Sequence, residues 1–143
     1  MANDFKWEDI DCSGIVTPKS VLLDFTNSFN EKFGRKLIMN LRSAQEQTLD
    51  WDLISLSGDT STNKPADITH YIEIQVPELD NYTLQILKVS HKVTSVYPCN
   101  VWQEIDDTKD TCEDADNLVA VLQIAINSTE LKKTIVNLLA QVN

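Results

Sequence analysis

Glycine and long apolar runs are scarce in this sequence. Only three glycines occur among 143 residues, so the chain lacks the glycine-rich loops that cradle phosphates in nucleotide-binding proteins. No apolar run approaches the roughly eighteen residues that a membrane span needs. Residues 1–11 are acidic where a secretory signal would be basic. We therefore expect a cytoplasmic protein with no membrane contact.

Cysteine is also sparse, and no metal-binding motif is present. The three cysteines (Cys12, Cys99 and Cys112) are widely spaced, form no CxxC motif and fit reduced thiols better than a disulfide framework. The acidic run at 104–116 lacks the central glycine and the ligand order of a calcium loop. These patterns predict no metal site and no cofactor.

The two histidines, His70 and His91, are the only side chains of the usual general-base type. A serine or cysteine nucleophile needs a positioned base. In an alternating strand pattern His70 falls on the core-facing parity and His91 on the opposite parity, so without a bulge they point to opposite faces. We therefore expect no shared histidine site, and we expect that the protein is not an enzyme.

Composition and charge indicate a single globular domain with an acidic surface. The chain is 42% hydrophobic and 24% charged, which is typical of globular proteins and fits one domain spanning residues 1–143. It carries 22 acidic and 12 basic residues, a formal net charge of −10. This charge disfavours direct binding to nucleic acid and to anionic lipid. A protein partner with a basic surface fits better.

The segment at residues 68–91 is expected to form the central hairpin of an antiparallel sheet. Apolar residues alternate with polar ones before and after a turn at residues 77–81. One register brings the large apolar side chains to a common face. It pairs Val76 with Tyr82, Ile74 with Leu84 and Ile72 with Ile86. Beyond Ile86 the apolar residues switch parity, which indicates either a bulge or a strand end covered on both faces.

The remaining segments complete an α+β pattern. Thr17 and Pro18 begin a helix that carries three phenylalanines at helical spacing and ends near Gly34. Further strands are expected at residues 36–42, 49–57 and 96–105, and Pro98 in the last of them indicates an edge strand or a bulge. Two helices follow residue 111, the first with a capping box formed by Thr111 and Asp114. We predict an antiparallel sheet of about five strands, with the N-terminal helix and the C-terminal helical pair packed on one face.

Two other segments lie outside this core pattern. Residues 1–16 form an N-terminal arm in which Phe5 and Trp7 either contact a partner or cover one edge of the core. Residues 58–67 contain no apolar residue larger than alanine and are expected to form a flexible loop. Four acidic residues before the C-terminal helices are not explained by capping. They are Glu104, Asp106, Asp107 and Asp110.

These observations favour an interaction protein of the inhibitor or immunity-protein type. Its carboxylates at 104–110 would steer a basic partner, and the aromatic residues of the arm would anchor it. One alternative is a small-ligand binder with a pocket between the sheet and the N-terminal helix. A second alternative is an inhibitor that mimics nucleic acid by presenting carboxylates in place of phosphates.

Overall fold

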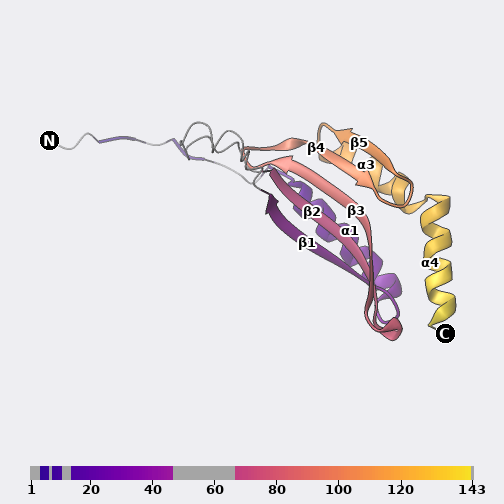
Figure 1. Ribbon diagram of the computed structural model, residues 1–143. Coiled ribbons are helices and arrows are strands. Elements are labelled where there is room, and N and C mark those ends of the chain that lie inside the picture. Colours follow the sequence, from indigo (N-terminus) through magenta and orange to yellow (C-terminus); the bar gives the residue numbers. More distant parts are fainter. Residues whose placement is uncertain (1–3, 7, 11–13, 47–66, 143) are drawn as a thin grey trace, which may run out of the picture.

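The structure is a computed structural model that describes residues 4–6, 8–10, 14–46 and 67–142. It confirms the predicted α+β fold (Figure 1). Helix α1 (Pro18–Phe33) precedes a five-stranded sheet, and helices α3 (Ala115–Ile126) and α4 (Thr129–Gln141) follow it. The strands are β1 (Ile38–Glu46), β2 (Asp67–Val76), β3 (Tyr82–Lys92), β4 (Ser95–Gln103) and β5 (Thr108–Cys112).

The sheet is an antiparallel meander in the order β1-β2-β3-β4-β5. Strands β2 and β3 form the predicted hairpin, joined by a short 3-10 turn η1 (Pro77–Leu79). The predicted pairs Val76–Tyr82 and Ile74–Leu84 are confirmed. The third predicted pair is wrong, because Ile72 pairs with Leu87.

A β-bulge causes this difference. Two consecutive residues of β2, Ile72 and Glu73, pair with Leu87 and Gln85 of β3. Ile86 lies between these two partners and is therefore the extra residue of β3. Both Ile86 and Leu87 are buried. The bulge was one of the two explanations that the parity switch left open. It reverses the facing of every β3 residue after Ile86 relative to an unbroken strand.

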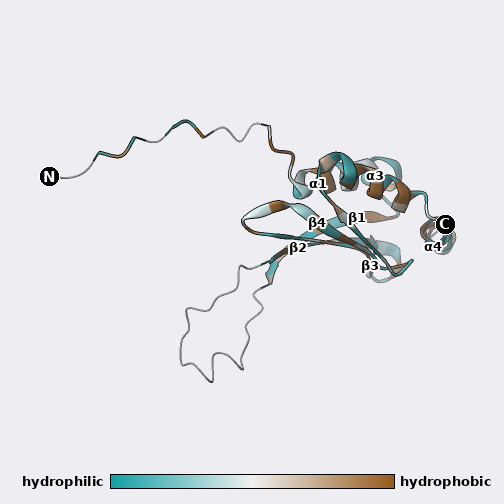
Figure 2. Cartoon of the chain, turned by 90° about the horizontal axis from the view of Figure 1, so that it is seen from above, coloured by the Kyte–Doolittle hydropathy of each residue, from teal (hydrophilic) through white to brown (hydrophobic). Residues whose placement is uncertain are grey.

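All three helices contribute to one hydrophobic core. Figure 2 shows α1 and α3 over the same face of the sheet, with α4 near one end. The core combines residues of all three helices with the inward-facing residues of the strands, including Leu22, Phe29, Ile74, Leu118 and Ile135. The other face of the sheet carries no helix of the described chain (Figures 1 and 2). No helix in the described ranges is long and apolar enough to cross a membrane.

The helix boundaries follow their capping residues. Thr17 caps α1 by accepting a hydrogen bond from the Ser20 amide at 3.2 Å. Gly34 ends this helix as predicted, although its φ of −49° requires no glycine. A Cβ at this position would lie 2.1 Å from the Asn30 carbonyl oxygen. Close backbone approach therefore explains this glycine.

The end of the sheet differs from the prediction. Strand β4 is not an edge strand, because β5 pairs with it along Cys99–Gln103. Pro98 lies where the β3–β4 register is interrupted, between the pairs Lys92–Ser95 and Ser90–Asn100, which fits the bulge that the sequence left as the alternative. Residues Thr108–Cys112 were expected to lead into a helix, yet all five form this extra edge strand. Thr111 lies inside β5, and the helix cap is Asp114, which accepts a hydrogen bond from the Asn117 amide at 2.8 Å. The predicted strand at 49–57 and the loop at 58–67, apart from its last residue, lie outside the described residues.

Candidate functional site

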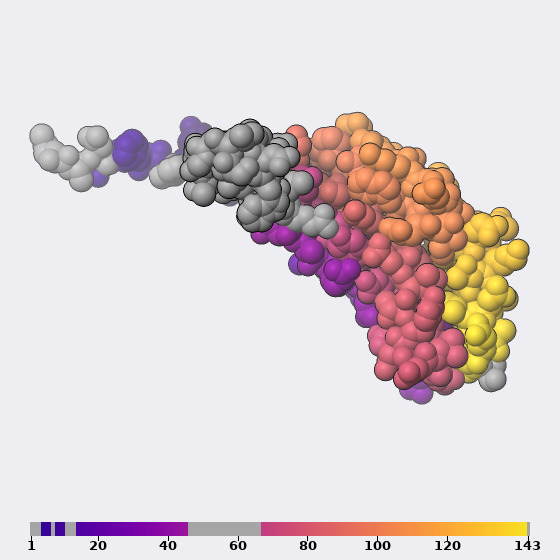
Figure 3. All heavy atoms as spheres, in the orientation of Figure 1, coloured from indigo at the N-terminus to yellow at the C-terminus, as the bar shows by residue number. Residues whose placement is uncertain are grey.

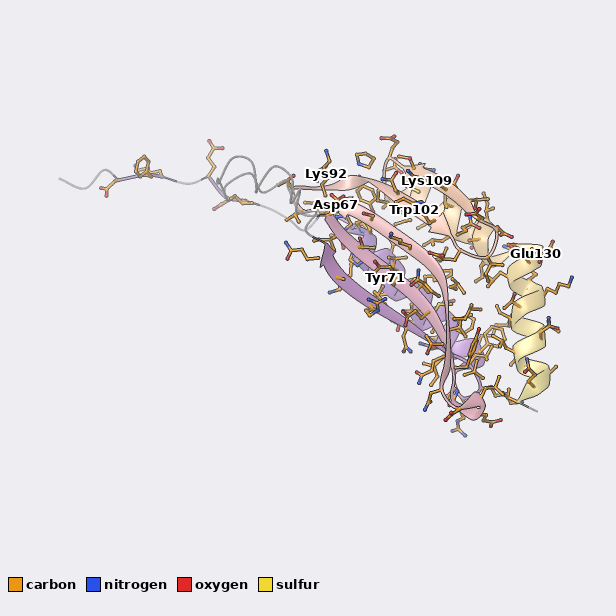
Figure 4. The ribbon with its side chains drawn as sticks, viewed as in Figure 1. Asp67, Tyr71, Lys92, Trp102, Lys109 and Glu130 are labelled. Atoms are coloured by element: carbon orange, nitrogen blue, oxygen red, sulfur yellow. The ribbon has the colours of Figure 1, made fainter. Side chains whose placement is uncertain are left out.

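The face of the sheet that carries no helix of the described chain is called the open face below. A line of alternating cationic and aromatic side chains, one from each strand, crosses this face. The strand registers place these five residues directly opposite one another. We call them the cation–aromatic row: Arg42, Tyr71, Lys88, Trp102 and Lys109. Figure 4 shows Tyr71, Trp102 and Lys109 on this face.

Within the row each aromatic ring lies next to two cations. The Arg42 guanidinium carbon is 4.3 Å from the centroid of the Tyr71 ring, and the Lys88 ammonium is 6.0 Å from it. The same ammonium is 5.2 Å from the Trp102 ring, and that of Lys109 is 4.9 Å from it. Such contacts contribute about 0.5–1 kcal/mol each at exposed sites. The row is therefore a preorganised arrangement rather than five independent side chains.

The two aromatic rings are half-buried, so part of each remains accessible. Arg42 is more exposed, with 55% of its side chain accessible, and it forms an ion pair with Glu73 at 3.3 Å. Hydrogen bonds between neighbouring polar side chains further order the face, for example from Gln85 to Glu104 at 2.8 Å. Contacts among its own side chains therefore help to order this face.

The charge of the open face differs from that of the chain as a whole. The strand registers assign four cationic residues to the described part of this face: Arg42, Lys88, Lys92 and Lys109. They also assign Asp67 and Glu73 to it, and Glu104 reaches it through its bond to Gln85. On a chain of net charge −10, this near-balance marks the face as a local departure from the acidic surface.

The four predicted acidic residues do not gather on one surface. Glu104 is hydrogen-bonded on the open face. Asp106 instead accepts a hydrogen bond from the Ser128 hydroxyl at 2.7 Å, and that hydroxyl caps α4. Asp106 and Asp110 both line a groove of about 940 Å³ between β5 and the C-terminal helices. Asp107 has a φ of 51°, a left-handed turn conformation that Asp tolerates. Capping of α4 thus explains one of the four carboxylates, Asp106.

The N-terminal arm is described only in part. Phe5 is 80% exposed, and Trp7 lies outside the described residues. Nearer the helix, the Tyr97 hydroxyl donates a hydrogen bond to the Val16 carbonyl at 2.7 Å. The chain is therefore attached to the sheet just before α1, and Phe5 does not cover the core.

The phenylalanine stripe of α1 divides between core and surface. Phe29 is buried, and its ring centroid is 4.8 Å from that of Phe33. Phe25 lines a groove of about 460 Å³ between α1 and α3, which also includes Leu122. This groove lies between two helices rather than between the sheet and α1.

The bulge also brings together the two histidines, which a regular alternating pattern would place on opposite faces of the sheet. His70 and His91 were expected on opposite faces, but both are buried on the helix side of the sheet and their Nε2 atoms are 3.0 Å apart. Burial, together with the nearby charges of His91 and Lys19, lowers the pKa of His70 from 6.5 to about 4. The expectation that the histidines do not meet was wrong.

Two of the cysteines are also neighbours. Cys99 and Cys112 pair directly across β4 and β5, and both are fully buried as free thiols. Burial raises the pKa of Cys99 to about 12, and burial also raises the pKa of Cys112. Since the thiolate is the reactive form, these thiols belong to the core rather than to a catalytic site.

The described residues contain no group of three or more histidine, cysteine, aspartate or glutamate side chains positioned to hold a metal ion. Comparison of the chain with protein-family models, with curated proteins and with solved structures finds no match in any of the three. The geometry of the described residues is therefore the basis on which a function can be assigned. Its most organised exposed feature is the cation–aromatic row.

Proposed function

We propose that this protein is a non-enzymatic interaction protein that binds and occludes a protein partner through the open face of its sheet. The cation–aromatic row supports the proposal most directly. It places two rings, Tyr71 and Trp102, at the middle of a face that the helices leave uncovered. Aromatic and arginine side chains dominate the binding energy of protein interfaces.

The row suits binding because its side chains are already ordered. A side chain that loses its freedom on association costs about 0.5–1.5 kcal/mol. Lys88 lies between the rings of Tyr71 and Trp102, and Arg42 is held by Glu73. Part of this side-chain freedom is therefore already lost in the free protein, which lowers the cost of binding. A sheet also holds its side chains more rigidly than a loop does, which favours a defined contact.

The turn at residues 104–107, between β4 and β5, carries Glu104, Asp106 and Asp107. We call it the acidic turn, and it would act at the border of the open face. Glu104 directly follows β4, two residues after Trp102, and its side chain lies on the same face. With the neighbouring Asp107 it would attract a partner that carries a basic patch next to its docking surface. Such steering raises the association rate more than the affinity and weakens as salt is added.

Chemical footprinting of lysines tests the location of the interface. The partner is captured from the host with the full-length chain, and the complex is treated with an acetylating reagent. Lys88 and Lys109 are expected to lose reactivity in the complex, while Lys132 and Lys133, exposed on α4, are expected to keep it. Equal reactivity of the row lysines in the free and bound protein would contradict the proposed surface.

Association kinetics test the acidic turn separately. Replacing Glu104 and Asp107 by their amides, with Asp106 left in place to support the α4 cap, is expected to slow association at low salt and to flatten its salt dependence. A control variant with Asp24→Asn and Glu31→Gln removes exposed charges from α1. If the turn variant and the control associate as fast as the unmodified protein at both salt concentrations, the turn has no steering role.

A further inference from the structure

His70 and His91 form a buried pair on the helix side of the sheet. The Nε2 atoms of His70 and His91 face each other at 3.0 Å. The other nitrogen of each ring contacts an oxygen atom, since His70 Nδ1 is 2.7 Å from Ser43 Oγ and His91 Nδ1 is 2.9 Å from the Lys92 carbonyl. Metal-binding histidines are typically oriented in this way, with the second ring nitrogen donating to an oxygen.

The hydrogen-bond partners define the proton positions in the free protein. A carbonyl oxygen only accepts, so His91 carries its proton on Nδ1 and presents a lone pair on Nε2. His70 then donates from Nε2 to that lone pair, and its own Nδ1 accepts from the Ser43 hydroxyl. In this arrangement a continuous chain of hydrogen bonds runs from Ser43 to the Lys92 carbonyl.

Ser43 allows the pair to change to a second arrangement. A hydroxyl both donates and accepts, so His70 can place its proton on Nδ1 and donate to Ser43 Oγ instead. Both Nε2 lone pairs then converge on the same point. A cation at that point would stabilise an arrangement that is otherwise repulsive. Each ring keeps one proton, so the exchange releases no net proton.

The spacing matches a tetrahedral transition-metal site. With zinc–nitrogen bonds of about 2.0 Å, two imidazole ligands at a tetrahedral angle have nitrogen atoms about 3.3 Å apart. The observed 3.0 Å needs only a small opening. We propose that His70 and His91 bind one divalent transition-metal ion of the zinc type, for which imidazole nitrogen is a favoured ligand.

The surrounding cavity leaves room for further ligands. It has a volume of about 490 Å³ and is lined by both histidines, by Ser43 and by Thr17 and Lys19 at the start of α1. Because the two histidines occupy two of the four positions, water or an anion fills the others. The ammonium of Lys19 favours an anion, such as chloride or a carboxylate, beside the metal.

Zinc titration with an NMR readout tests the site on the full-length chain. Before zinc is added, the imidazole spectra are expected to show His70 protonated on Nε2 and His91 on Nδ1. Addition of one equivalent of Zn²⁺ is expected to move both rings to the Nδ1-protonated form, and Mg²⁺ is expected to change neither. The proposal is overturned if His70 keeps its Nε2 proton at saturating zinc.

Calorimetric titration of variants gives an independent measure. His91→Gln is expected to abolish the binding of one zinc ion per chain, and Ser43→Ala to weaken it about tenfold through loss of ring orientation. Asp24→Asn, which removes an exposed carboxylate from α1, is the control, and it is expected to bind zinc as the unmodified protein does. Unchanged binding in folded His91→Gln would overturn the proposal. If that variant does not fold, the NMR titration of the unmodified protein decides the question.

Discussion

The histidine pair makes a quantitative prediction about acid stability in the metal-free protein. Burial and the nearby charges of His91 and Lys19 lower the pKa of His70 from 6.5 to about 4. The unfolded chain therefore takes up a proton on this residue at a higher pH than the folded chain does. Stability that is fully present above pH 6.5 is expected to be lost as the pH falls toward 4.

The magnitude follows from the size of the pKa change. One pKa unit corresponds to about 1.4 kcal/mol, so lowering the pH from 6.5 to 4 is expected to cost about 3 kcal/mol through His70 alone. That is a large fraction of the stability of a typical domain. The protein is therefore expected to unfold in acid earlier than a matched variant that lacks this ionisable group.

Urea unfolding at pH 7 and pH 4.5, with a chelator present, measures the effect. His70→Gln retains hydrogen-bonding groups but does not titrate, and it serves as the matched variant. The carboxylates titrate in both proteins, so the difference between their pH dependences isolates the histidine. The unmodified protein is expected to lose about 2–3 kcal/mol more than the variant. Equal losses would refute the reasoning.

Three further predictions concern the core and its edges. Ile74→Asp is expected to unfold the protein because it buries an unpaired charge. Glu73→Lys is expected to change the free energy of unfolding in a urea melt by only about 1 kcal/mol, because it removes the ion pair with Arg42 at the surface. Cys99 and Cys112 are expected to resist alkylation in the folded protein and to react in urea, as mass spectrometry would show; rapid labelling without urea would contradict their burial. Asn30→Ala is expected to cost about 1–3 kcal/mol in thermal melts, because this side chain satisfies an amide and a carbonyl of edge strand β1; an unchanged melting temperature would show that water replaces it freely.

Much of the fold followed from apolar periodicity. The hairpin, the N-terminal helix and the C-terminal helical pair each repeat apolar residues at the spacing that one buried face requires. Strand β5 was missed because only Cys112 of its five residues is buried. An edge strand with one buried residue has no alternating pattern to detect, and its pairing with β4 is decided by the tertiary structure.

The site was less predictable for a related reason. The row residues occupy the polar parity of their strands, where sequence patterns carry little information about neighbours. Tyr71 and Trp102 meet Lys88 only through the registers of three separate strands. The meeting of His70 and His91 depends on a bulge that the sequence indicated only as one of two explanations. A single extra residue in β3 decided which side chains share a face.

The affinity of the captured partner for two single variants tests the central proposal most directly. Trp102→Ala removes the ring between Lys88 and Lys109 in the cation–aromatic row, and Tyr82→Ala removes a ring that is 51% exposed outside the row. We expect Trp102→Ala to weaken binding at least about tenfold, or about 1.4 kcal/mol, with little change for Tyr82→Ala. Equal affinities of the folded Trp102→Ala variant and the unmodified protein would contradict the open face as the binding surface.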